Sequence, residues 1–424
     1  MRPNIVSSFA VLAAIALVGT PVSALTLDRA QRKSDLAFLV DQIAAHYAYL
    51  QDRHIDLPKL QAIYERKAEA ADAPDAFLHV IEEAVSELHD HHATLGVNND
   101  DSPQLIPTGT EIWAQMRNGR AILTEVRRRG DAARVGLRAG DEVLAIDGVP
   151  VAEALTRAGP KALAEADPEA DNFTLRTLLA GTHEGYRLFT VRGRDGVVRE
   201  ARLAPYKPPH AKQLVVWRWV KPKIGYIRIE NSLGESDTVK AFDAALEDLK
   251  GADGLILDLR NTPSGGSSDV GEPILGRFIT KASAYQRVFD PGPGKVYPNN
   301  SWLKTATPRG TCVKAKLVVL VDHWTSSMGE GITIGFDALQ RAKIVGTEMA
   351  GLSGGTAEFT LPNSKISIHL PTEQLYQVNG ARREIFTPAY LVDLAGSQGD
   401  DPIFERGVEV LERDLSGNSE SFGH

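Results

Sequence analysis

Residues 316–330 read KLVVLVDHWTSSMGE, and this stretch indicates a buried β-strand that turns directly into a helix. The apolar run 317–321 is short and rich in valine, which is typical of a strand that is buried on both faces. Ser326 and Ser327 follow at the turn, and a helix is expected over 329–339. A serine at such a turn is exposed at the sheet edge, where the helix N-terminus favours negative charge. Taken alone, however, two serines before a helix are also typical of a helix cap.

A second stretch of the same kind lies at 254–266 and reads GLILDLRNTPSGG. Gly265 and Gly266 permit a bend that points backbone N–H groups into a cleft, as an oxyanion hole requires, although the pair is also compatible with an ordinary tight loop. A strand is expected at 224–229 and an amphipathic helix at 238–249. This alternation predicts a largely parallel sheet with crossover helices, whose chemistry lies beyond the carboxyl ends of the strands.

The pattern changes twice on the amino-terminal side of these strands. From residue 28 to 89, apolar residues recur at three- and four-residue spacings, which predicts a bundle of about three helices within 25–100. Within 101–206, short apolar runs are broken by Gly and Asp, as in a small β-rich domain. Lys207-Pro208-Pro209 resembles a linker and opens the last domain, 207–424. Several domains are also what a chain of 424 residues predicts.

The amino terminus has the form of an export signal. Arg2 precedes an apolar run at 9–18 and a small-residue segment that ends at Ala24. We therefore expect a signal peptide at 1–24, cleaved after Ala24, although an uncleaved membrane anchor is the alternative. A single cysteine, Cys312, cannot form an internal disulfide. Export without cysteine pairs favours a bacterial periplasmic or secreted protein.

The composition narrows the choice of partners. Apolar residues make up 43% and charged residues 24% of the chain, which are ordinary values for a soluble protein. The formal net charge of -8 shows no basic excess, so neither nucleic acid nor an anionic membrane is expected as a partner. No later segment is apolar for long enough to span a bilayer, so no membrane association is expected after signal removal.

Three histidines lie together in LHDHHAT at 88–94. A metal site is one interpretation, but His89 and His92 stand three residues apart without an accompanying Glu or Cys motif. A serine nucleophile needs just one histidine as its general base, presented from elsewhere in the fold. The remaining interpretation is that these histidines have a packing or surface role.

Residues 130–151 read GDAARVGLRAGDEVLAIDGVPV and resemble a bacterial PDZ domain. The resemblance covers a short helix, a Gly-Leu turn, a Gly-Asp strand entry and an Ile-Asp-Gly hairpin. Asp147-Gly148 alone would indicate only a hairpin turn. The resemblance implies that 101–206 is a PDZ-like domain.

The order of helical segment, PDZ-like module, Asp-Leu-Arg-Asn…Gly-Gly loop and serine turn resembles the tail-specific (C-terminal-processing) serine peptidase family. This resemblance spans nearly the whole mature chain. It implies an α/β fold with a parallel-rich βαβ catalytic core of the ClpP/crotonase type, an N-terminal helical bundle and an inserted β-rich PDZ domain. Aligning the family's serine motif on Thr325 and Glu330 places the nucleophile at Ser327 rather than at Ser326.

The sequence departs from the better-known branch of that family, which uses a Ser-Lys dyad. The equivalent segment, 346–355, reads GTEMAGLSGG and contains no lysine, and Lys343 precedes it. The chain is therefore similar to the branch that includes the tricorn-protease core and the retinoid-binding repeats. That resemblance implies His92 as the base and Glu384 as a residue that positions the network. The segment 384–390 lacks the glycine and the aspartate of the family motif.

The resemblance implies a serine endopeptidase that hydrolyses peptide bonds in unfolded protein tails or in peptides. Met328 and either Gly265 or Gly266 would supply the N–H groups of the oxyanion hole. No cofactor and no metal are expected, and a homo-oligomer is compatible with the sequence. One alternative is a catalytically inactive ligand- or peptide-binding protein on the same scaffold. Another is a metallohydrolase that uses His89, His91 and His92, for which carboxylate ligands are lacking.

Overall fold

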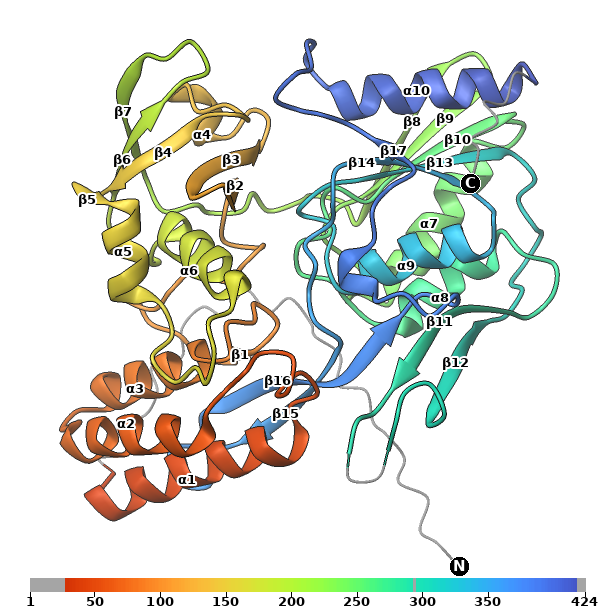
Figure 1. Ribbon diagram of the computed structural model, residues 1–424. Helices are drawn as coiled ribbons and strands as arrows, with labels where there is room; N and C mark the ends of the chain where they lie inside the picture. Colours follow the sequence, from red (N-terminus) through yellow and green to blue (C-terminus); the bar gives the residue numbers. More distant parts are fainter. Residues whose placement is uncertain (1–26, 293–294, 418–424) are drawn as a thin grey trace, which may run out of the picture.

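The computed structural model describes residues 27–292 and 295–417. The predicted signal peptide at 1–24 lies outside these residues. A helical bundle, a small β-rich unit and a larger sheet covered by helices pack together (Figure 1). Within the described ranges, no helix is both long and apolar enough to cross a membrane.

The larger sheet has six strands. They are β8 (Val215–Lys221), β9 (Ile224–Ile229), β10 (Gly254–Asp258), β13 (Lys316–Val321), β14 (Lys343–Gly346) and β17 (Tyr390–Leu391). The order is β17-β14-β13-β10-β9-β8, with β8 antiparallel to β9 and all other neighbours parallel. Asp258 is level with Leu320, so the loops that follow β10 and β13 leave the sheet side by side. The strand-helix alternation predicted from sequence is present.

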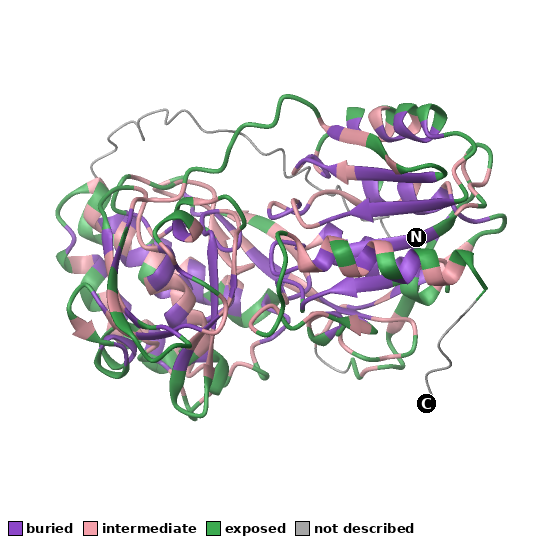
Figure 2. Cartoon of the chain, turned by 90° about the horizontal axis from the view of Figure 1, so that it is seen from above, coloured by how far each residue is buried: buried purple, intermediate pink, exposed green. Residues whose placement is uncertain are grey.

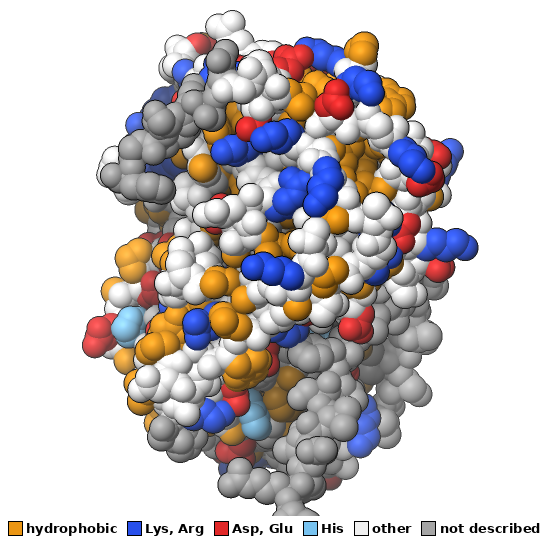
Figure 3. All heavy atoms as spheres, turned by 90° about the vertical axis from the view of Figure 1, so that its right-hand side faces the viewer, with side chains coloured by type: hydrophobic (Ala, Val, Ile, Leu, Met, Phe, Trp, Pro, Cys, Tyr) orange, Lys and Arg blue, Asp and Glu red, His pale blue; other side chains and the backbone are white. Residues whose placement is uncertain are grey.

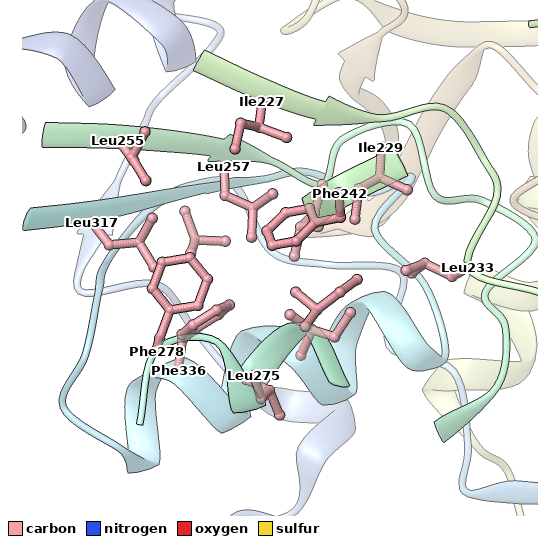
Figure 4. Packing of buried hydrophobic residues seen from close by; sticks show 14 of the residues in the cluster. Ile227, Ile229, Leu233, Phe242, Leu255, Leu257, Leu275, Phe278, Leu317 and Phe336 are labelled. Carbon is pink, nitrogen blue, oxygen red and sulfur yellow. The ribbon is translucent and has the colours of Figure 1, made fainter. Parts of the chain in front are cut away.

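Helices cover both faces of this sheet. On one face lie α7 (Asp237–Asp248), α8 (Ser268–Gly276) and α9 (Met328–Ala338), and on the other lies α10 (Pro402–Leu415) (Figure 1). Phe336 of α9 and Phe278, which follows α8, point towards Leu255, Leu257 and Leu317 on the strands (Figure 4). Every residue of β10 is buried, which explains its unbroken apolar sequence. Figure 2 shows the same pattern, with buried strands beneath helices that are exposed on their outer sides.

The N-terminal bundle contains three helices, as its periodicity predicted: α1 (Arg29–His46), α2 (Leu57–Ala70) and α3 (Pro74–Ser86). Its core also contains residues from the last third of the chain, contributed around β15 (Gly355–Thr360) and β16 (Ser367–Tyr376). The buried carboxylate of Asp35 accepts hydrogen bonds from the backbone N–H groups of Asn363 and Ser364. The bundle is therefore completed by a segment that is remote in sequence.

A second sheet connects the bundle to the helix-covered sheet. It contains β16 and β15 together with β1 (Thr94–Leu95), β11 (Ser283–Phe289) and β12 (Ser301–Ala306). β1 follows directly on the histidine segment and pairs antiparallel with β16. Through β16, the histidine segment is attached to the sheet that also contains β11 and β12.

The β-rich unit is an antiparallel sheet with three helices. Its elements are β2 (Ile112–Arg117), β3 (Arg120–Val126), α4 (Asp131–Arg134), β4 (Glu142–Ile146), β5 (Val149–Pro150), α5 (Val151–Ala158), α6 (Pro168–Ala180), β6 (Arg187–Arg192) and β7 (Val198–Leu203). The predicted short helix and the Asp147-Gly148 hairpin turn are present, and both turn residues have positive φ, as such turns require. The sequence reading did not predict α5 and α6.

Candidate active site

Ser327 is the N-cap residue of helix α9, at the carboxyl edge of the sheet. Its backbone has φ 49° and ψ -108°, a conformation that non-glycine residues rarely adopt. Such strain typically costs about 1–3 kcal/mol and persists only where surrounding contacts impose it. Here the Ser327 N–H donates a hydrogen bond of 2.7 Å to the carboxylate of Glu330. The turn is therefore held in a strained conformation by a buried carboxyl group.

The two neighbouring serines have different environments. Ser326 is fully buried, and its hydroxyl donates to the carbonyl oxygens of Pro263 at 2.8 Å and Thr262 at 3.1 Å. Ser327 is half-buried. A Cβ atom added at Gly265 would lie 2.4 Å from Ser327 Cβ and 3.0 Å from Ser327 Oγ. The Ser327 side chain therefore lies against the glycine loop, whereas the Ser326 hydroxyl is used to join two loops.

The two glycines of the loop differ in whether their backbone N–H groups are free to act as donors. Gly265 has φ +62°, and its N–H already donates to the Thr262 carbonyl at 3.0 Å. The Gly265 N–H, one of the predicted oxyanion donors, is thus engaged in a turn. A Cβ at Gly266 would lie 2.1 Å from the carbonyl carbon of Leu233, so this position requires glycine. Among the hydrogen bonds of the described residues, the N–H groups of Gly266 and Met328 have no acceptor.

His92 is fixed at the end of the bundle by its ring and by its backbone. Its Nδ1 lies 2.5 Å from the carbonyl oxygen of Ser353, so Nδ1 carries the proton and Nε2 is the basic nitrogen. The His92 N–H donates to Asp90, which also accepts a hydrogen bond from the hydroxyl of Tyr47. Burial lowers the pKa of His92, so the ring is neutral at neutral pH. This is the protonation state that a general base needs.

His92 and Ser327 are not hydrogen-bonded to each other in the described structure. They are linked indirectly through Arg383, which lies between the serine turn and the loop that contains Ser353. Its guanidinium donates to the carbonyls of Ser327 at 3.3 Å, Leu352 at 2.9 Å and Gly354 at 3.2 Å. The sequence predicts a serine–histidine pair, and in the structure the two residues are connected through Arg383 and the loop that contains Ser353.

The other two histidines of the cluster have structural contacts. His89 Nε2 lies 2.7 Å from a carboxylate oxygen of Asp167. The His91 ring stacks on Phe173 of α6, with the ring centroids 4.4 Å apart. The three rings thus have three different partners. In the described ranges, no three His, Cys, Asp or Glu side chains are arranged to hold a metal ion.

Glu384 lies on a short 3-10 helix, η1 (Arg383–Ile385), next to the arginine just described. Its Oε1 contacts Arg382 at 3.3 Å, and its Oε2 is buried without a hydrogen-bond partner in the described structure. Burial raises the pKa of Glu384. The hydroxyl of Tyr49 is likewise buried and unpartnered, and Glu384 contributes to the raised pKa of Tyr49. Glu384 therefore has unused acceptor capacity near the site but no contact with Ser327.

The sequence reading missed Glu330 and Arg383. Glu330 served only to align the serine motif, yet its side chain is completely buried. It accepts hydrogen bonds from the backbone N–H groups of Ser327 and Gly351, and burial raises its pKa to about 7. A Ser-x-x-Glu pattern before a helix is the sequence signature of a capping box, so a local signal for Glu330 existed.

His323, four positions before Ser327, joins the serine turn to the β-rich unit. Its Nδ1 lies 2.6 Å from Glu125 Oε2, and its ring stacks on Trp113 with the centroids 5.0 Å apart. Thr347 donates a hydrogen bond to the same carboxylate. Burial lowers the pKa of His323 to about 3 and raises that of Glu125 to about 7. The serine turn is therefore connected to the β-rich unit through His323 and to the loop that holds His92 through Arg383.

A cavity of about 1510 Å³ lies between the β-rich unit and the carboxyl edge of the sheet. Asn261, Asp322 and Trp324 line it, together with Arg127, whose guanidinium lies 4.6 Å from the Trp324 ring centroid. Ser327, His92 and Glu384 are not among its lining residues. The cavity borders the serine turn at Asp322 and Trp324, and it is not itself the candidate catalytic site.

Residues 223–388 match the model of Peptidase family S41. The carboxyl-terminal-processing protease of Synechocystis sp. is 32% identical over 223 residues, which are 52% of this chain and 46% of that protein. The chain thus spans about half the length of this curated relative.

Two solved structures share the fold over most of the chain. The photosystem II D1 C-terminal processing protease has a TM-score of 0.57 at 18% identity, covering 91% of this chain and 98% of that one. Mature CPAF has a TM-score of 0.59 at 15% identity, covering 93% and 99%. The matched residues include the serine turn, the glycine loop and Arg383. Residues 223–388 of this chain are therefore similar to peptidase family S41, and the fold of the chain is similar to that of the D1 C-terminal processing protease and of mature CPAF.

Proposed function

We propose that this protein is a serine-type peptidase that hydrolyses peptide bonds in protein tails or unfolded segments, with Ser327 as the nucleophile. One observation carries the proposal: Ser327 begins α9 in a strained turn against the Gly265-Gly266 loop, inside the segment that matches the family. Strained strand-to-helix turns are where nucleophiles are exposed in several hydrolase folds. The contrast with Ser326, whose hydroxyl is already used, supports Ser327 over its neighbour.

The reaction follows from the positions of the donors and acceptors. His92 Nε2 accepts the proton of Ser327 Oγ as the oxygen attacks the peptide carbonyl. The unpartnered N–H groups of Gly266 and Met328 then stabilise the oxyanion, and losing one such donor typically costs about 10²–10³ in turnover. His92 next protonates the leaving amine, and water resolves the acyl-enzyme. Because His92 and Ser327 share no hydrogen bond in the described structure, we expect substrate binding to bring Nε2 and Oγ together.

A histidine base is also supported by the position of Lys343, the lysine closest in sequence to the segment 346–355. Lys343 is exposed and begins β14, level with Val318. The serine turn lies beyond Val321, which is level with Gly346 at the other end of the same strand pair. Lys343 is therefore at the amino end of the strands, away from Ser327. We propose that the chain uses Ser-His rather than Ser-Lys catalysis, with Glu384 as a residue that positions the network.

We also propose that the β-rich unit is PDZ-like and that the helix-covered sheet is a ClpP/crotonase-type core. A PDZ domain binds peptides by adding a strand at an open sheet edge. Here that edge, β2, is occupied by α6: Asn172 accepts from the Met116 N–H at 2.7 Å, and Arg176 Nε donates to the Ala114 carbonyl at 3.3 Å. A peptide could add to β2 only after these two side chains withdraw.

Protein or peptide substrates are the partners proposed for this enzyme, in the bacterial periplasm or outside the cell. The signal-like segment at 1–24 supports export, and the similar protein from Synechocystis sp. is bacterial. On the face shown in Figure 3, lysine and arginine side chains are interspersed with acidic ones. A mixed surface of this kind, with a net charge of -8, does not favour nucleic acid as a partner.

The second candidate is an inactive peptide-binding protein on the same scaffold. It is favoured by the absence of a hydrogen bond between His92 and Ser327 in the described structure, which leaves the nucleophile without a hydrogen-bonded base in this conformation. The two functions differ in one property, which is whether Ser327 reacts as a nucleophile. A binding protein would retain its ligand without acylation.

Labelling with a fluorophosphonate probe distinguishes the two candidates. We expect the wild type to be labelled, Ser327→Ala to be unlabelled and the matched Ser326→Ala to remain labelled. His92→Ala should react much more slowly. Labelling of Ser327→Ala would refute the assignment of the nucleophile, and an unlabelled, folded wild type would favour the binding protein. Labelling that a chelator abolishes would point to the metal alternative.

A further inference from the structure

Arg383 is a buried arginine whose donors converge on backbone carbonyls from two separate segments. Nη1 donates to the Ser327 carbonyl, and Nη2 donates to the carbonyls of Leu352 and Gly354. The side chain is 3% exposed, and its Nε has no hydrogen-bond partner in the described structure. The guanidinium is therefore held mainly by main-chain oxygens, whose positions it fixes in turn.

Glu330 meets the same two segments from inside α9. One carboxylate oxygen accepts from the Ser327 N–H at 2.7 Å, and the other accepts from the Gly351 N–H at 3.0 Å. The Arg383 guanidinium lies 3.8 Å from this carboxylate. The Ser327 backbone is thus held by both members of a buried ion pair. Its N–H contacts Glu330, and its C=O contacts Arg383.

The segment on the far side of the pair is the one that orients His92. Gly351, Leu352 and Gly354 are the contacts of the pair, and Ser353, between them, provides the carbonyl that binds His92 Nδ1. The proposed nucleophile, Ser327, and the proposed base, His92, come from widely separated parts of the chain. In the described structure, the Glu330–Arg383 pair and the loop at 351–354 form the connection between them.

We propose that Glu330 and Arg383 form a clamp that positions Ser327 relative to His92, so that Arg383 is a positioning residue for the reaction. The inference rests on the proposed peptidase function. The planar guanidinium suits this task because both of its Nη atoms donate at fixed angles, which a single lysine ammonium cannot reproduce. A displacement of about 1 Å at a reacting group can reduce turnover about 10²-fold.

The test is the rate at which a fluorophosphonate labels Ser327, combined with kcat and KM for an unstructured peptide. We expect Arg383→Ala to lower the labelling rate and kcat about 10²-fold with little change in KM, because the clamp acts on geometry and not on substrate binding. Ethylguanidinium added to Arg383→Ala should restore part of the lost rate. Arg383→Lys should keep the charge and still react slowly.

Arg187 provides a matched control. It is also a buried arginine that donates to main-chain carbonyls, those of Leu179, Ala180 and Ala204, and its Nε is likewise unpartnered in the described structure. Arg187→Lys should therefore impose a similar structural perturbation in the β-rich unit. We expect it to label at close to the wild-type rate. Guanidinium should not accelerate it.

The outcomes separate this proposal from the peptidase function itself. A folded Arg383→Ala or Arg383→Lys that labels at the wild-type rate overturns the clamp and leaves the nucleophile assignment intact. Labelling that persists in Ser327→Ala overturns the peptidase function instead. If Arg383→Ala does not fold, as judged by circular dichroism, Arg383→Lys and Glu330→Gln decide the question. Wild-type labelling rates in both would refute the clamp, and slow labelling of folded protein in both would support it.

Discussion

Two histidines flank the serine turn, and their surroundings differ. His323 is close to Ser327 in sequence but is bonded to Glu125, stacked on Trp113 and buried at the boundary with the β-rich unit. His92 is remote in sequence, is held by the Ser353 carbonyl through Nδ1 and is half-buried. A short distance in sequence from Ser327 therefore does not identify the base. What matters is which ring nitrogen remains basic and accessible.

Burial, rather than the carboxylate partner, makes His323 unsuitable as a base. Its Nε2 is buried with no hydrogen-bond partner in the described structure, and its pKa of about 3 leaves it a weak proton acceptor. The His323 ring therefore packs the serine turn against the β-rich unit, through its contacts with Glu125 and Trp113. His92, in contrast, keeps a neutral ring whose tautomer is set by a backbone carbonyl.

The largest expected effect comes from replacing the proposed base. His92→Gln should lower kcat/KM about 10³-fold, because general-base assistance is lost. His323→Gln should change kcat/KM by less than about tenfold while reducing thermal stability. Peptide hydrolysis by both variants, measured beside their melting temperatures, tests the comparison. The reverse ranking of the two variants would make His323 the functional histidine.

A smaller effect is expected at Glu384, whose unpartnered carboxylate oxygen is buried next to Arg383 in the chain. Glu384→Gln should lower kcat about tenfold to 10²-fold, as for a residue that positions others. Because burial raises the pKa of Glu384, the wild-type rate should increase with pH as this carboxyl ionises. The glutamine variant should lack that part of the pH-rate profile. An unchanged profile would remove Glu384 from the network.

The His323–Glu125 pair predicts a compensated pH dependence of stability. Between about pH 4.5 and 6.5, the folded pair holds one proton on Glu125 and the unfolded chain holds one on His323, so the pair adds little slope. In Glu125→Gln, only the unfolded state binds a proton in this range. Stability should then rise with pH, by up to about 1.4 kcal/mol per unit.

His323→Gln should show the opposite slope. The remaining Glu125 binds a proton in the folded state, with a pKa of about 7, but not in the unfolded state above about pH 4.5. Stability should therefore fall as pH rises towards 7. Urea unfolding at several pH values measures both slopes. Equal slopes in the two variants would contradict the shared proton.

The smallest effect should come from Ser353→Ala. His92 is held by the carbonyl of Ser353, and the hydroxyl of Ser353 is contacted only at 3.4 Å by Arg53 among the described residues. Removing the hydroxyl should therefore change kcat/KM by less than about threefold, since one weak hydrogen bond is lost. A loss as large as that of His92→Gln would show that the side chain, and not the backbone, orients the base.

The sequence predicted those parts of the site that depend on local patterns. A valine-rich run, a serine turn and a following helix are adjacent in the chain, so their geometry follows from short-range preferences. The paired glycines after β10 belong to the same class of signal. The resemblance to a peptidase family then assigned roles to Ser327 and His92, and it did so without any information on the distance between them.

Long-range contacts could not be predicted in this way. The sequence alone determined a parallel αβ core with Ser327 at its carboxyl edge, because strand, turn and helix signals are encoded over a few residues. The tertiary structure decided that β15 and β16 complete the bundle, that Gly265 uses its own N–H in a turn and that Arg383 joins Ser327 to the loop that holds His92. These contacts join residues distant in the chain, where pattern and propensity carry no information about which side chains meet.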